Sequence, residues 1–105
     1  MQNTNQVNLV EQAEQYYSAG KISKDNAEYD DACNCFSEAA PLYDILARQA
    51  KSPKERIGYL EKLRECLQPL AVQTLMPGFD TRPWSRIIRK LDEISKEIAE
   101  LDRLQ

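Results

Sequence analysis

The sequence predicts an all-α fold, and three features of its pattern support this. Apolar residues recur three and four positions apart along most of the 105 residues, which is the period of a helix that buries one face. No stretch alternates apolar and polar residues as a half-buried strand does. Glycine and proline are few and fall mostly near the expected helix ends. We therefore expect four helices.

The first two helices are expected over residues 7–24 and 28–50. The apolar stripe of the second helix consists of Tyr29, Ala32, Cys33, Phe36, Ala39, Ala40, Tyr43 and Leu46. We expect Tyr29 and Phe36 to be buried between these two helices. Pro41 has no backbone N–H to donate within the helix, so we expect a kink at this position but not a helix end.

The third helix has a clear start signal. Ser52 has the side chain of an N-cap, Pro53 suits the first helical position, and Glu55 occupies the reciprocal capping position three residues after the cap. The Met-Pro-Gly-Phe run at 76–79 must end this helix. A fourth helix is expected over residues 82–104.

The fourth helix has the apolar spacing of a coiled coil. Its apolar positions recur at intervals of three and four residues over nearly three heptads. They are Trp84, Ile87, Leu91, Ile94, Ile98 and Leu101. We call this set the seam. Two arrangements would bury it: pairing with a second copy of the chain, or packing on the first three helices.

Charge is unevenly distributed along the fourth helix. Residues 82–90 carry basic side chains and no acid, whereas acidic side chains dominate residues 92–102. This order opposes the helix macrodipole, which favours acids at the N-terminus and bases at the C-terminus. An antiparallel copy, a partner protein or a neighbouring helix of opposite direction would bring the basic half against acidic groups and the acidic half against basic groups.

The composition argues against catalysis and against several kinds of ligand. The chain contains no histidine, the commonest general base and metal ligand, and its three glycines form no phosphate-binding loop. Cys33 and Cys35 lie about 200° apart on a helix, so they cannot bind one metal ion together. The formal net charge of −3 disfavours a nucleic-acid partner. We expect no catalytic residue, no cofactor and no metal.

The sequence also predicts a location. It contains no run of 18 apolar residues, so we expect no membrane insertion. The number of cysteines is odd, and we expect no signal peptide before them. We therefore expect a cytoplasmic protein with reduced cysteines.

Part of the chain resembles a known family of helical hairpins. Residues 24–32, followed by Phe36 and Ala39, resemble the turn and second helix of MIT domains, the microtubule-interacting and trafficking modules. Residues 59–65 are similar to the last helix of that family, so the resemblance covers roughly residues 7–70. The same segment also resembles a single tetratricopeptide repeat, through Tyr16, Gly20, Ala32, Phe36 and Ala39.

The resemblance implies an antiparallel three-helix bundle over residues 1–76, followed at 77–105 by a linker and the amphipathic fourth helix, packed on the bundle or dimerising. It also implies a non-catalytic adaptor. MIT domains bind short amphipathic helices from the tails of membrane-remodelling ESCRT proteins, so the groove would lie between the second and third helices or the first and third.

We expect a groove in this chain to use the apolar residues left over from the core stripes, which are Leu42, Ile45, Tyr59 and Cys66. The alternative function is a self-associating helical scaffold or chaperone-like subunit. In that case the seam makes a homodimer, and no peptide groove is used.

Overall fold

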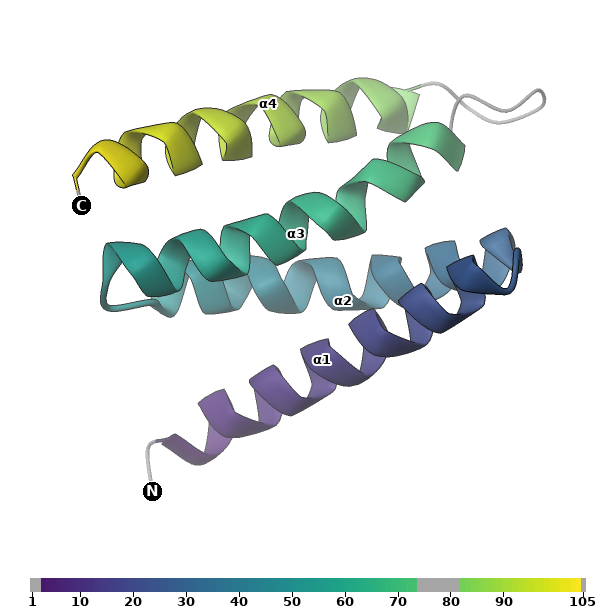
Figure 1. Cartoon of the computed structure of the whole chain (residues 1–105), viewed down its shortest axis with the longest axis horizontal. Helices are drawn as coiled ribbons and strands as arrows, with labels where there is room; N and C mark the ends of the chain where they lie inside the picture. The colour runs from purple at the N-terminus through teal and green to yellow at the C-terminus, as the bar shows by residue number, and fades with distance from the viewer. Residues whose placement is uncertain (1–2, 74–81, 105) are drawn as a thin grey trace.

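The computed structural model describes the backbone of residues 3–73 and 82–104 and the side chains of residues 8–72 and 85–104, and it confirms the all-α prediction. Within those ranges the chain forms four α-helices and no strand (Figure 1). The helices are α1 (Asn3–Asp25), α2 (Tyr29–Gln49), α3 (Pro53–Gln73) and α4 (Arg82–Arg103).

The four helices are stacked in chain order. Helix α1 packs on α2, α2 on α3, and α3 on α4, and successive helices run in opposite directions (Figure 1). The connections before and after α2 are only a few residues long, which favours antiparallel neighbours. As a result α1 and α4 lie on opposite sides of the α2–α3 pair.

The turn between α1 and α2 ends α1 with a Schellman motif. The Glu28 N–H donates to the Ser23 carbonyl at 2.8 Å, and the Ala27 N–H donates to the Lys24 carbonyl at 3.0 Å. Ala27 has a φ of 61°, the left-handed conformation that glycine usually supplies at this position. The sharp turn brings the end of α1 beside the start of α2.

The expected start of α3 is confirmed, and neither internal proline ends its helix. The Glu55 N–H donates to Ser52 Oγ at 3.2 Å, which makes Ser52 the N-cap. Helix α2 continues past Pro41, and α3 continues past Pro69.

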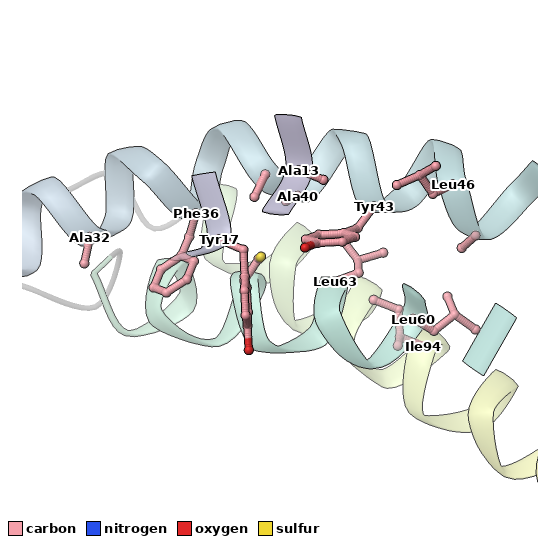
Figure 2. Packing of buried hydrophobic residues seen from close by; sticks show 13 residues of the cluster. Ala13, Tyr17, Ala32, Phe36, Ala40, Tyr43, Leu46, Leu60, Leu63 and Ile94 are labelled. Atoms are coloured by element: carbon pink, nitrogen blue, oxygen red, sulfur yellow. The ribbon is translucent and has the colours of Figure 1, made fainter. Parts of the chain in front are cut away.

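All four helices contribute to one apolar core (Figure 2). Helix α2 lies at its centre and supplies more buried side chains than any other described helix. The buried cluster consists of Ala13, Tyr17, Ala32, Phe36, Ala39, Ala40, Tyr43, Leu46, Ala47, Leu60, Leu63, Cys66 and Ile94. The many alanines let neighbouring helices approach closely, because a methyl group adds little to the helix radius.

The two aromatic residues expected to be buried in the α1–α2 hairpin differ in burial. Phe36 is 3% exposed, as predicted. The prediction for Tyr29 is wrong, because its side chain is 60% exposed. Tyr29 is the first residue of α2 and follows the tight turn directly, so it lies at the end of the hairpin and not between the two helices.

Helix α1 passes close to the Phe36 ring of α2 at Gly20. A Cβ atom at this position would lie 2.7 Å from Phe36 Cε1, closer than non-bonded carbon atoms normally come. The absence of a side chain at Gly20 therefore allows the Phe36 ring to pack directly against the α1 backbone.

We predict that Gly20→Ala lowers the free energy of unfolding by about 1–3 kcal/mol, because the new methyl group displaces the Phe36 ring. The matched control is Gly58→Ala in α3, where a Cβ would meet nothing within 4 Å. That change should raise stability by up to about 1 kcal/mol, because alanine favours a helix more than glycine does. Urea denaturation of both variants measures the difference, and equal stability of the two would contradict the close approach.

Candidate functional site

A hollow of about 600 Å³ opens between the end of α1, the start of α2 and the end of α3. We call it the α1–α3 hollow, because these two helices form its walls while α2 forms its floor. It lies at the same end of the molecule as the turn between α1 and α2 (Figure 1).

The inner surface of the α1–α3 hollow is mostly apolar. Its floor includes Ala32, Cys33 and Phe36, all of which are buried. Tyr29 and Val72 also line the hollow, and their side chains are 60% and 62% exposed. Exposed apolar side chains beside a concave surface are typical of a binding site.

Tyr17 of α1 contacts both α2 and α3 beside the hollow. Its hydroxyl donates a hydrogen bond to the Glu65 carboxylate on α3. Its ring packs edge-on against Phe36 and Tyr43 of α2, with centroid distances of 6.2 and 6.1 Å. Lys62 Nζ lies 4.1 Å from the ring centroid, a cation–π contact. Two residues that line the hollow, Phe36 and Glu65, are therefore held in place by contact with Tyr17.

Burial raises the pKa of three groups in or beside the hollow, Tyr17, Cys33 and Cys66. Desolvation, assisted by the hydrogen bond to Glu65, raises the pKa of Tyr17 to about 12. Burial likewise raises the pKa of the Cys66 thiol to about 12 and the pKa of Cys33 above its ordinary value. The Cys33 thiol contacts the Pro69 carbonyl at 3.8 Å, within the range of a weak hydrogen bond.

The four residues predicted to line a groove do not line the α1–α3 hollow. Cys66 is fully buried, so the expectation that it faces a partner is wrong; it packs inside the core between the helices. Leu42 and Tyr59 are partly buried and pack against the core, and Ile45 is 39% exposed. A role for Leu42, Ile45 and Tyr59 in binding a partner stays a prediction from the sequence.

The seam of α4 packs within the chain. Ile94 is 2% exposed, and Ile98 and Leu101 pack against the core cluster. Ile87 and Leu91 are partly buried, and the side chain of Trp84 lies outside the described residues. Of the two arrangements that the sequence leaves open, the structure shows packing on the preceding helices.

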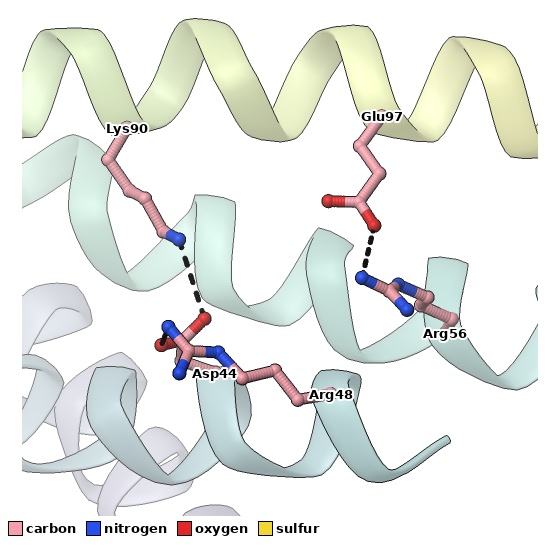
Figure 3. A network of polar contacts seen from close by, with 5 residues as sticks. All are labelled: Asp44, Arg48, Arg56, Lys90 and Glu97. Atoms are coloured by element: carbon pink, nitrogen blue, oxygen red, sulfur yellow. Dashed lines mark ion pairs between the residues drawn. The ribbon is translucent and has the colours of Figure 1, made fainter. Parts of the chain in front are cut away.

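Neighbouring helices also provide partners for the uneven charge of α4 (Figure 3). In its acidic half, Glu97 Oε2 lies 2.6 Å from Arg56 Nη2 of α3. In its basic half, Lys90 Nζ lies 3.5 Å from Asp44 Oδ1 of α2. Asp44 also pairs with Arg48 one turn along α2. The charge order of α4 opposes the helix macrodipole, but each half of the helix has a partner of opposite charge. The acidic half pairs with Arg56 of α3, and the basic half pairs with Asp44 of α2.

Among the helices described, none combines the length and the apolar character needed to cross a bilayer. Within the described ranges, no group of three or more cysteine, aspartate or glutamate side chains is placed to hold a metal ion.

We predict that Tyr17 contributes to a fall in stability at alkaline pH. The unfolded chain releases this proton near the ordinary pKa of 10.0, whereas the folded chain holds it until about pH 12. The contribution is therefore fully present below pH 10 and is lost as the pH rises towards 12. Guanidinium denaturation across this range should show a smaller decline for Tyr17→Phe than for the parent. Tyr16→Phe, which removes a hydroxyl at an exposed neighbouring position, is the matched control, and an equal decline in all three proteins would contradict the assignment.

We predict that Ile94→Asp strongly destabilises the fold, because it places a carboxylate among the core side chains. The melting temperature should fall well below that of the control Ile88→Asp, whose parent side chain on the same helix is 39% exposed.

Light scattering of the parent should give a mass near 12.1 kDa. A parent of twice that mass that becomes a folded monomer on Ile94→Asp would show instead that the seam joins two chains.

Comparison with known proteins gives no match: no protein-family model fits the chain, and no curated protein or solved structure is similar enough to be matched. The all-α architecture therefore stands on the helices themselves. The resemblance to MIT domains and to a tetratricopeptide repeat stays a prediction from the sequence.

Proposed function

We propose that this chain is a non-catalytic protein-interaction module that binds a short amphipathic helix of a partner protein in the α1–α3 hollow. The observation that carries the proposal is the pair of exposed apolar side chains, Tyr29 and Val72, beside a concave apolar floor. An amphipathic helix laid between two helices buries its apolar face in such a groove. Binding would cover surface that is otherwise exposed to water.

The distribution of polar groups favours a helix over a small molecule. Small-molecule sites usually contain a few polar groups inside an apolar pocket, which fix the orientation of the ligand. Among the buried floor residues, the polar group is the Cys33 thiol, which already has the Pro69 carbonyl as a partner. The charged side chains belong to the walls and the rim, where the polar flanks of a bound helix would reach them.

The position of the hollow agrees with one of the two grooves implied by the resemblance to MIT domains, the one between the first and third helices. A role as an adaptor in membrane trafficking follows from that resemblance and is part of the proposal. So is a cytoplasmic location, in which the free cysteines Cys33, Cys35 and Cys66 would stay reduced.

The proposal is tested with a displayed library of 18-residue helical peptides that share a leucine face and have randomised flanks. Clones selected on the parent protein are synthesised with a fluorescent label, and Kd is measured by anisotropy. Val72→Glu should weaken binding at least tenfold, because a carboxylate would lie against the leucine face. The side chain of Val72 is exposed, so the fold should tolerate the change.

The matched control is Ile22→Glu. Ile22 lies on α1, is 62% exposed like Val72, and does not line the hollow. Its replacement should leave Kd unchanged, and both variants should melt close to the parent temperature. A selection that yields no clone dependent on Val72 would contradict the proposed function.

A further inference from the structure

We infer that the partner helix carries acidic residues along the flank that faces α1 and basic residues along the flank that faces α3. This inference rests on the proposed function and specifies the chemistry of the partner. It follows from the signs of the charges on the two walls of the α1–α3 hollow and from the absence of ion pairs among them.

The α1 wall is basic. Lys21 and Lys24 lie three residues apart, so they share one side of the helix, and both line the hollow. Among the described residues neither forms an ion pair; Lys21 Nζ lies 5.3 Å from the Tyr17 ring centroid. Asp25, the last residue of α1, is the one acid on this wall and leaves it with a net positive charge.

The α3 wall is acidic. Glu65 is the one charged residue of α3 among those that line the hollow, and it forms no ion pair with a described residue. Asp30, in the first turn of α2, is a second carboxylate in the lining and also forms no ion pair with a described residue. One oxygen of Glu65 accepts the Tyr17 hydrogen bond, which fixes the carboxylate in position. Basic side chains on the flank of a bound helix that faces α3 would meet the Glu65 carboxylate.

The two kinds of contact have different roles. Burial of the apolar face supplies most of the attraction, because each exposed ion pair contributes little by itself. Charges at the edge of an interface mainly select the partner and its orientation. Since the two walls differ in sign, a helix with two like-charged flanks would place one flank against a wall of the same sign.

The same peptide library tests this inference through the flanks of the selected clones. On the parent protein we expect clones with glutamate or aspartate on one flank and lysine or arginine on the other. The double variant Lys21→Glu/Lys24→Glu makes both walls acidic. It should bind those clones about tenfold more weakly at low salt and should select peptides that are basic on both flanks. Exchanging the acidic flank of a selected peptide for lysines should restore its binding to the double variant.

The matched control is Lys51→Glu/Lys54→Glu, which changes the net charge by the same amount near the turn between α2 and α3, at the other end of the molecule. It should keep the parent's preference, and circular dichroism should show that both double variants are folded. Clones that depend on Val72 but show no flank preference, or like charges on both flanks, would overturn the inference and leave the proposed function standing.

Three results would count against the proposed function itself: no Val72-dependent clone, dimerisation of the chain through the hollow, or displacement of selected peptides by a small apolar molecule that binds there more tightly. Sedimentation of the parent and of Val72→Glu shows whether the chain dimerises through the hollow. Any of the three would also remove the basis of the inference.

Discussion

The contacts of Tyr17 are the interaction on which the arrangement of the first three helices depends. From α1 this residue packs edge-on against Phe36 and Tyr43 of α2 and donates a hydrogen bond to Glu65 of α3. One turn later, Gly20 lets the Phe36 ring contact the α1 backbone. An aromatic ring joined to three helices costs little conformational entropy to order, because it has few rotatable bonds.

The stacking order explains why a hollow remains at one end of the molecule. Helix α1 packs mainly on α2, and α4 covers the far side of α3, so no described helix closes the space between the ends of α1 and α3. Tyr17 bridges these two helices further in, and beyond it the apolar floor around Phe36 stays open. Tyr29 and Val72 are exposed for the same reason.

Local features of this sequence predicted the helices well. The N-cap at Ser52 and the apolar period depend on residues close together in the chain, so they were correct without knowledge of the packing. The predictions that Tyr29 is buried and that Cys66 faces a partner were wrong. The apolar period shows which face of a helix is apolar, but it does not show how far along that face a neighbouring helix packs. The seam of α4 left two answers open, since a heptad pattern is the same whether the partner helix lies in the same chain or in another.

Helix binding in the α1–α3 hollow is tested most directly by an NMR titration of the labelled protein with a peptide selected from the library. We expect the largest chemical-shift changes at Tyr29, Ala32 and Val72, which line the α1–α3 hollow, with little change at the exposed Ile22 and Ile45. Changes centred on Ile45, with Val72 unaffected, would contradict it, because the peptide would then occupy a different surface of the molecule.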